Sequence, residues 1–437
     1  MTSKPPAALP ADLPERIALA EEVHARPPEP ITAPSRASFV ALLVAAEARP
    51  HELRHLSQLC EQHGQTAPPA GAVHWSGRLG ELRLKWERHG EFSSYTFLLN
   101  GRVAVGFSNT AAQHLPPGWL SQMPGQTVMA AHAELLHAEE EMPAPEVQQQ
   151  FFSGHALVGA EIAGGAGQAF SDFQIHPDGF SRFVLVGRAF TPTMGGRMLQ
   201  RLFEIEAYRM MALLALPVAR RLSPRLLEIE RALARLTDDI ARDGGRDELL
   251  LQDLTRLAAE VESGLAASQF RFGACRAYAE LVRTRIAELR ETRIPGLQTL
   301  DEFMSRRFTP AVATCATVSQ RLHDLSERVA QASHLLSTRV DIVREKQNHA
   351  LLASMDRRAH LQLRLQQTVE GLSVAAIVYY MAGVVGYLAK GAKALGLAVN
   401  VDLVVGVAVP LLVIATMTAV RRARHEAGER EALPARD

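Results

Sequence analysis

The chain has 437 residues, enough for two or three compact units. Lys and Arg together number 47, as do Asp and Glu, so no net charge favours binding to nucleic acid or acidic substrates. The three cysteines lie far apart and form no CxxC pair, which argues for a reducing compartment and against a disulfide framework or a structural zinc site. The N-terminal stretch has no apolar core, so we expect no cleaved signal peptide and cytoplasmic soluble parts.

Residues 1–36 are rich in proline and alanine and are expected to form an extended lead-in. Apolar and polar residues then alternate within residues 37–190. In this region "ELRLKWE" has the pattern of a half-buried strand, and "HGE" turns the chain into a second strand, "FSSYTFLL". Asn100-Gly101 predicts another turn, after which "RVAVGF" pairs back.

A further hairpin is predicted by "SDFQI", the turn "HPDG" and "FSRFVLV". Helical stretches are expected near residues 38–63 and 126–140. The glycine-rich run at 159–168 matches neither a phosphate-binding loop nor a dinucleotide fingerprint, and it is interpreted as a connection between strands. Residues 37–190 are therefore predicted to form a cytosolic α+β domain with an antiparallel sheet.

Residues 191–370 are predicted to form a helical bundle and stalk. Helices are expected to end at Pro217, to break at Gly244-Gly245 and to end again at Pro295, and a very long one starts near Gln298. Within it, residues 322–350 are coiled-coil-like, with Arg339 and Lys346 interrupting the seam. These interruptions favour a short bundle or an oligomer contact over a strict dimeric zipper. The apolar seam positions are Leu322, Leu325, Val329, Ala332, Leu336, Val343 and Ala350.

Residues 371–420 are predicted to be a transmembrane hairpin. The runs 372–389 and 403–420 hold no charge, and as helices each spans about 27 Å, close to the roughly 30 Å hydrocarbon core. The alternative is a buried helical hairpin in a large soluble core, which two such runs in tandem disfavour. Small residues four apart favour close packing between spans or subunits. These pairs are Gly371 with Ala375 and Ala382 with Gly386.

Charges at the ends of the spans predict their orientation. Arginines flank the hairpin on both sides, whereas its connection carries Lys390 and Lys393 against Asp402. The positive-inside rule therefore places both termini in the cytoplasm. The arginines are Arg357, Arg358 and Arg364 before the first span and Arg421, Arg422 and Arg424 after the second. The last three begin the basic and then polar tail, 421–437, and are interpreted as an anchor to anionic lipid.

Residues 51–55 contain His-Glu-x-x-His, the two-histidine signature of zinc proteases. His51 and His55 would share one helix face, and Glu52 would be the general base. The extended spacing of metzincins requires Gly and His at the positions of Gln58 and Glu61, so no motif supplies a third ligand. We interpret the segment as a solvated helix face. The sequence thus predicts no catalytic residue, no cofactor and no metal ligand.

Acidic residues gather around the predicted helix break. They suit either a Mg²⁺ or Ca²⁺ site between subunits or a solvated turn near helix caps, and we favour the turn. The residues are Asp238, Asp239, Asp243, Asp247 and Glu248.

Three stretches carry a resemblance to a family: "RIALAEEVHARP", "GELRLKWERHGEFSSYTF" and the run from "STRVDIVREKQNHALL" to "GYLAKG". They resemble an uncharacterised bacterial family of membrane-anchored proteins, domain of unknown function 3422. That resemblance implies the inner membrane and no known activity. The order of elements also resembles CorA-type magnesium channels, which are pentamers whose first span ends in Gly-Met-Asn. Here that end reads "YYMAGVVGYLAKG", without the signature, and the positive connection would repel divalent ions.

We therefore expect a membrane-anchored, cytosol-facing assembly or scaffold protein without catalytic activity. Its partners would be the lipid bilayer and further copies of itself, through the stalk and the first transmembrane helix, and not nucleic acid. The alternative is a CorA-like oligomeric channel or transporter for a divalent cation that lacks the Gly-Met-Asn signature.

Overall fold

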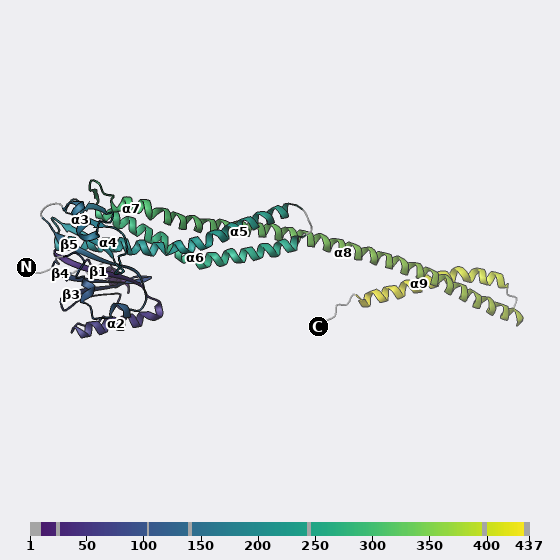
Figure 1. Cartoon of the computed structure of the whole chain (residues 1–437). Coiled ribbons are helices and arrows are strands. Elements are labelled where there is room, and N and C mark those ends of the chain that lie inside the picture. The colour runs from purple at the N-terminus through teal and green to yellow at the C-terminus, as the bar shows by residue number, and fades with distance from the viewer. Residues whose placement is uncertain are drawn as a thin grey trace, which may run out of the picture. The chain divides into compact units, whose positions relative to one another are not determined.

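A computed structural model describes residues 10–22, 27–102, 105–138, 142–242, 246–395 and 400–431, without side chains for 18, 21, 22 and 423–431. Contacts divide the chain into two units, residues 1–334 and 335–437. In the first unit a sheet lies beside a bundle of helices (Figure 1). The second unit contains the larger, C-terminal part of one very long helix and the helix that follows it.

The sheet has nine strands in the order β2-β3-β4-β1-β5-β8-β7-β6-β9. Only β5 and β8 pair in parallel, so the sheet is mixed, where the sequence predicted an antiparallel one. The strands are β1 Ser35–Leu43, β2 His74–Leu79, β3 Leu82–Arg88, β4 Phe92–Asn100, β5 Gln126–His137, β6 Val158–Ile162, β7 Gly167–Ser171, β8 Ser181–Gly187 and β9 Thr292–Arg293.

Two strands overturn the helices predicted near 38–63 and 126–140. β1 and β5 are neighbours in the middle of the sheet; nearly all residues of β1 and the central eight of β5 are buried. A strand covered on both faces reads as a continuous apolar run without alternation, and such a run resembles a buried helix. Within 38–63 only Arg49–Gln62 is an α-helix, α2.

The predicted hairpins are partly present. β3 and β4 pair around the turn at "HGE", and β7 pairs with β8. β6 and β7 pair with each other, and only residues 163–166 of the glycine-rich run connect them, whereas the whole run 159–168 was predicted to be a connection. The segment "RVAVGF" gives no described strand, and its Val103 and Ala104 lie outside the described residues. β4 pairs instead with β1, which comes from the start of the chain.

The helices are α1 Arg16–Glu22, α2 Arg49–Gln62, α3 Ala144–Phe152, α4 Pro192–Leu213, α5 Ala215–Ala241, α6 Asp247–Leu289, α7 Leu300–Arg307, α8 Thr309–Ala394 and α9 Val401–Glu431. Short 3-10 turns lie at Ala46–Ala48, Ala111–His114 and Leu120–Gln122. The chain changes helix at Leu214, three residues before the predicted Pro217. α6 is one helix of 43 residues, and it ends at Leu289, ahead of the predicted end at Pro295. The predicted break at Gly244-Gly245 falls outside the described residues, between α5 and α6.

The sheet has helices on both faces. Leu56, Leu59 and Cys60 of α2 pack in one apolar cluster with Trp86 and Phe97 of the sheet. A second cluster joins α3 to the other half of the sheet. On the opposite face Phe203 of α4 stacks on Phe39 of β1, with ring centroids 4.9 Å apart. Because residues alternate between faces along a strand, α2 and α3 share one face and α4 covers the other.

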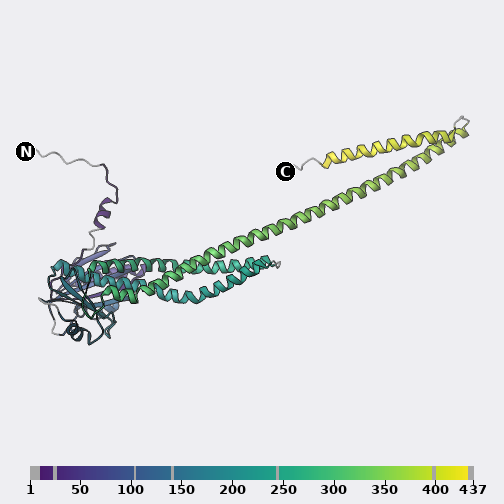
Figure 2. The same cartoon turned by 90° about the horizontal axis from the view of Figure 1, so that it is seen from above.

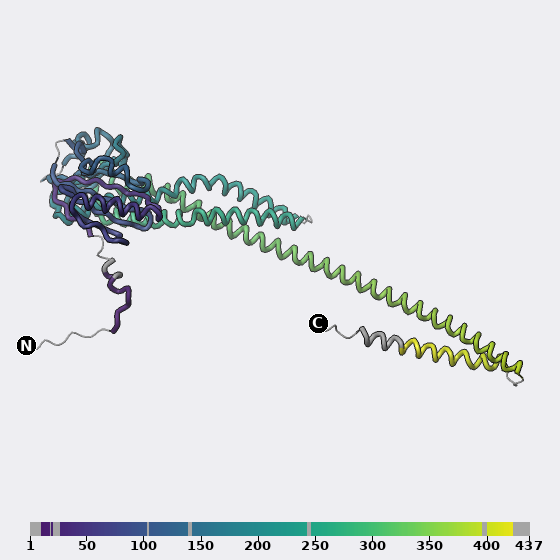
Figure 3. The backbone as a smooth tube through the Cα atoms, turned by 90° about the horizontal axis from the view of Figure 1, so that it is seen from below, coloured from purple at the N-terminus to yellow at the C-terminus, as the bar shows by residue number. Residues whose placement is uncertain are grey.

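The bundle consists of α4, α5, α6 and the beginning of α8, which run side by side (Figures 1 and 3). Ion pairs link these helices: Arg225 with Glu260 joins α5 to α6, and Arg321 with Glu230, at 2.9 Å, joins α8 to α5. Arg201 with Glu288, also at 2.9 Å, joins α4 to α6.

The predicted seam of the stalk is buried in its first half. Leu322, Leu325 and Val329 are at most 1% exposed, and within the first unit they face the other bundle helices of the same chain. Further along α8, Leu336 is buried, whereas Val343 and Ala350 are exposed. The coiled-coil contact between copies therefore stays a prediction, and its first half is already occupied within one chain.

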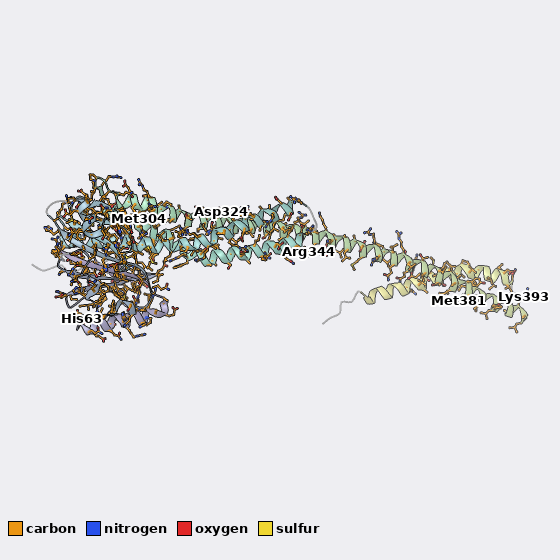
Figure 4. All side chains as sticks on the ribbon, in the orientation of Figure 1. His63, Met304, Asp324, Arg344, Met381 and Lys393 are labelled. Atoms are coloured by element: carbon orange, nitrogen blue, oxygen red, sulfur yellow. The ribbon has the colours of Figure 1, made fainter. Side chains whose placement is uncertain are left out.

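In the second unit α9 runs back beside the end of α8 (Figures 1 and 2). Figure 4 labels Met381 and Lys393 on this part of α8. Gly386 of α8 is close to Val405 of α9, since a Cβ atom added at the glycine would lie 3.5 Å from a Val405 methyl.

Candidate functional site

The end of α8 and the start of α9 are long and apolar enough to cross a membrane. In their most apolar 18-residue windows, 11% and 0% of the residues are buried within the chain. Large apolar side chains such as Leu372, Tyr379 and Tyr387 are therefore exposed, each by about three quarters of its surface. A core helix of a soluble protein would have one apolar side covered by the rest of the fold.

The small residues predicted to pack the spans lie in two different settings. Ala382 and Gly386 line the space between α8 and α9. Gly371 and Ala375 are exposed, and a Cβ atom at Gly371 would meet nothing within 4 Å. The second pair is thus available for a contact outside the chain, and its role in packing stays a prediction.

The predicted lipid anchor lies at the end of the apolar part of α9. Arg421 and Arg422 are exposed there, as a juxtamembrane anchor requires. The side chain of Arg424 lies outside the described residues. Lipid binding by these arginines stays a prediction.

The His-Glu-x-x-His segment lies on α2, but its face is not solvated as predicted. Glu52 is 0% exposed, and its Oε1 accepts hydrogen bonds from Trp86 Nε1 at 3.1 Å and Tyr95 OH at 2.9 Å. Arg88 Nη2 lies 3.9 Å from the other oxygen. The polar composition of α2 predicted an exposed face, whereas two of its polar side chains point inward.

His55 is also part of this core. It stacks on Trp119 at 4.7 Å and its Nε2 donates to the Trp119 carbonyl at 3.0 Å, so that nitrogen is not free for a metal. Burial lowers the pKa of His55, which keeps the ring neutral. His51 points to solvent. The motif therefore connects α2 to the sheet and builds no zinc site.

A serine, a histidine and an aspartate also line up near the centre of the sheet. Ser38 Oγ lies 2.8 Å from His132 Nδ1, and His132 Nε2 lies 4.0 Å from Asp178 Oδ2. Ser38 is 0% exposed and its oxygen already accepts from the backbone N–H of Ala112. A substrate has no access to it, so this arrangement is structural.

Two histidines and an aspartate form the only group of three or more potential metal ligands within the described ranges. Their ligand atoms lie within 4.8 Å of one another. Asp172 Oδ2 is 2.9 Å from His155 Nδ1 and 3.0 Å from His176 Nε2. We call this group the His155–Asp172–His176 cluster.

Local backbone geometry positions the cluster. His155 follows the end of α3, where Ser153 has the left-handed conformation and Gln148 Nε2 donates to the carbonyl of His155 at 2.9 Å. Asp172 comes directly after β7, and His176 lies in the turn that leads into β8, where its N–H donates to the Phe180 carbonyl at 3.0 Å.

The sequence did not predict this cluster, because the pattern of "SDFQI" indicates a strand over all five residues. The strand stops at Ser171, and Phe173 has a φ of 52°, which turns the chain. The available signal was an aspartate and a histidine four residues apart beside a Pro-Asp-Gly turn. Nothing in the sequence pointed to His155 as their neighbour.

The acidic residues around the predicted helix break form no such group among those the structure describes. Asp239 pairs with Arg242 at 3.8 Å, and Asp243 lies outside the described residues. Asp247 and Glu248 stand in the first turn of α6, where acidic residues favour a helix N-terminus.

A cleft between the sheet and α4 is lined by Phe39, Lys85, Phe203 and Tyr208, among others. Its volume is about 40 Å³. That space holds a few water molecules at roughly 10–15 Å³ each and no metabolite. We assign no ligand to it.

The three cysteines are free thiols, as predicted, and all are buried. Cys275 of α6 and Cys315 of α8 share a side-chain hydrogen bond. That contact lowers the pKa of Cys275, whereas hydrogen bonding and burial raise the pKa of Cys315.

A mixed sheet with helices on both faces, continued by a long helix and an apolar helical hairpin, defines an α+β protein with two candidate membrane spans. A family model described as "Protein of unknown function (DUF3422)" matches residues 11–427. The chain belongs to this family, as its sequence indicated. No curated protein and no solved structure matches it. The likeness to CorA-type channels therefore rests on the order of elements alone.

Proposed function

We propose that this protein is a membrane-anchored scaffold, whose α8–α9 hairpin crosses the bacterial inner membrane and holds the α+β unit at the cytoplasmic face. One observation carries the proposal: the apolar windows of both helices have almost no cover from the rest of the chain. Apolar surface gains about 25 cal/mol per Å² when it leaves water, so helices with this much uncovered surface need lipid around them.

The flanking charges support the orientation. Arg421 and Arg422 are exposed beyond the second apolar stretch, and Lys390 and Asp402 lie at the connection between the two helices. More basic residues flank the hairpin than its connection. Both termini would then lie in the cytoplasm, on the side of the α+β unit.

The surface of α8 ahead of its apolar window supports self-association. Leu351, Leu352, Met355, Leu361 and Leu365 are each about 60% exposed or more, and they precede the part that would enter the membrane. Exposed leucines in such number are typical of a helix that packs against another copy. A scaffold that gathers several copies at the membrane would cover them.

Membrane fractionation and cysteine labelling test the anchor. The expected result is a protein that stays in the membrane pellet after an alkaline wash. In a background without native cysteines, Lys393→Cys should react with an impermeant maleimide added to spheroplasts, and Arg421→Cys should react only after lysis. A wash that releases the protein would refute the anchor, and labelling of both positions from outside would refute the orientation.

Charged substitutions in the hairpin sharpen the test. Ile414→Lys places a charge in the apolar part of α9 and should cost about 2.5–3.5 kcal/mol of insertion free energy. It should therefore shift protein to the soluble or degraded fraction. Arg422→Lys keeps the charge at the end of the span and is the matched control.

The native mass of the detergent-solubilised chain separates the scaffold from the channel alternative. Light scattering corrected for bound detergent should give a small oligomer, and a dimer leaves no room for a central pore. A pentamer would favour the CorA-like alternative instead. Divalent-ion flux in liposomes would then be the decisive measurement.

A further inference from the structure

The carboxylate of Asp172 is buried without an Arg or Lys partner among the described side chains. Its side chain is 0% exposed, and its ion-pair contacts are to His155 and His176. A buried carboxylate is costly unless a positive charge or a full set of hydrogen bonds compensates it. Within the described residues its one further hydrogen bond comes from the backbone N–H of Gln174, which donates to Oδ1 at 3.2 Å. The two imidazoles lie at hydrogen-bond distance from Asp172 Oδ2, so either their N–H groups or a cation bound between the three side chains compensates the carboxylate.

The geometry points to a cation. We propose that His155 Nδ1, Asp172 Oδ2 and His176 Nε2 bind one divalent transition-metal ion, with Zn²⁺ as the first candidate. Zinc ligands lie about 2.0–2.2 Å from the ion, so two of them are about 3.4 Å apart in a tetrahedron. The two distances to the aspartate oxygen, 2.9 and 3.0 Å, are already close to that value.

To bind an ion, the two imidazole nitrogens, which lie at most 4.8 Å apart, must approach each other, and each must move slightly away from the aspartate oxygen. Their rings are tilted by 32° and their centroids are 5.6 Å apart. The His155 side chain is 41% exposed and sits on the short loop after α3, so its ring has room to turn toward the ion. Asp172 and His176, which are buried, provide the two preformed positions.

The ligand set defines the class of metal. Two imidazole nitrogens and one carboxylate oxygen suit zinc and neighbouring transition metals, whereas Mg²⁺ and Ca²⁺ prefer oxygen ligands alone. The exposed side of His155 leaves a fourth position open to water. Three protein ligands and an open position are the arrangement of zinc sites that bind a water molecule or a substrate.

A bound ion would join two loops that are distant in the sequence. His155 follows α3, and Asp172 and His176 belong to the connection between β7 and β8. Phe173, in the same connection, stacks on Phe303 of α7 at 4.6 Å. The metal would therefore stiffen the surface where α3, the β7–β8 connection and α7 meet. This inference does not depend on the membrane anchor.

Zinc binding to the full-length chain tests the proposal. The protein is purified in detergent with an affinity tag free of histidine, stripped with a chelator and dialysed against buffered low-micromolar free Zn²⁺. Elemental analysis should find about one zinc per chain. His176→Ala and Asp172→Asn should lower that content to near zero, and zinc should raise the melting temperature of the wild-type chain alone.

The matched control is His51→Ala, which removes an exposed histidine of the same domain and should keep the zinc. Asp172→Asn preserves the shape of the side chain, and His155→Ala changes a partly exposed one, so at least one variant should fold as judged by tryptophan fluorescence. A wild-type chain that binds no zinc would overturn the proposal. So would folded cluster variants that keep the metal, or an equal loss in His51→Ala.

Discussion

Replacing Glu52 by alanine should destabilise the α+β unit strongly. The substitution leaves the indole N–H of Trp86 and the hydroxyl of Tyr95 without their acceptor inside the core. Each unsatisfied buried donor costs about 1–3 kcal/mol. Arg88 also loses its carboxylate partner, and breaking one side of a buried pair typically costs about 3–5 kcal/mol. Since these terms overlap, we expect a total loss of about 3–5 kcal/mol.

Two further substitutions separate the loss of the charge from the loss of the hydrogen-bond acceptor and provide an exposed control. Glu52→Gln removes the charge but keeps an oxygen that accepts from Trp86 and Tyr95, so we expect a loss of about 1–2 kcal/mol. Glu61→Ala removes an exposed carboxylate from the same helix and should stay within about 0.5 kcal/mol of the wild type.

The assay is urea unfolding of the full chain in detergent, followed by tryptophan fluorescence. All three tryptophans, Trp75, Trp86 and Trp119, belong to this unit, so the signal reports its unfolding and not that of the apolar hairpin. The reasoning would be refuted if Glu52→Ala unfolded at the same urea concentration as Glu61→Ala.

Burial lowers the pKa of His132 to about 4, below the 6.5 of an unfolded histidine, so between these pH values the unfolded chain binds one more proton than the folded chain. The free energy of unfolding should therefore fall by up to about 3 kcal/mol as the pH drops from 6.5 to 4, and His132→Gln should reduce this pH dependence in urea titrations. Gly196→Ala would place a methyl 1.8 Å from the carbonyl oxygen of Glu29, so it should lower the free energy of unfolding in urea by about 1–3 kcal/mol. Gly273→Ala, with open space around it, should be neutral or stabilising in the same urea titration. Burial raises the pKa of the Cys60 thiol to about 11, so at pH 8 this thiol should react with a disulfide reagent far more slowly in the native chain than after denaturation. Equal reaction rates in the two states would contradict the burial of Cys60.

Two features of the sequence predicted structure well: the alternation of apolar and polar residues in strands, and the length of the uncharged runs near the C-terminus. The hairpin of β3 and β4 was predicted because one face of each strand carries polar residues that mark the period. β1 and β5 could not be recognised in this way, because helices cover both of their faces: α2 or α3 lies on one side and α4 on the other. Where both faces are buried, composition says that a segment is internal but not which backbone it adopts.

The candidate sites also could not be judged from the sequence alone, because their contacts depend on the tertiary structure. The protease motif is defined by spacing along one helix, and spacing cannot say that Glu52 already bonds two aromatic side chains from the sheet. The His155–Asp172–His176 cluster has the opposite character. Its members come from two loops that meet only because β7 and β8 pair and α3 packs beside them. Such sites depend on tertiary structure and leave little trace in a linear pattern.

β9 has a practical consequence for work with fragments. Its two residues, Thr292 and Arg293, pair with Ala160 and Glu161 of β6 after the whole of α6 has been made. A fragment that ends at residue 190 would keep eight strands but leave the backbone of β6 unpaired along its outer side. Unprotected strand edges recruit other strands, so such a fragment should aggregate. A fragment extended through the end of unit 1, at residue 334, would keep that edge covered.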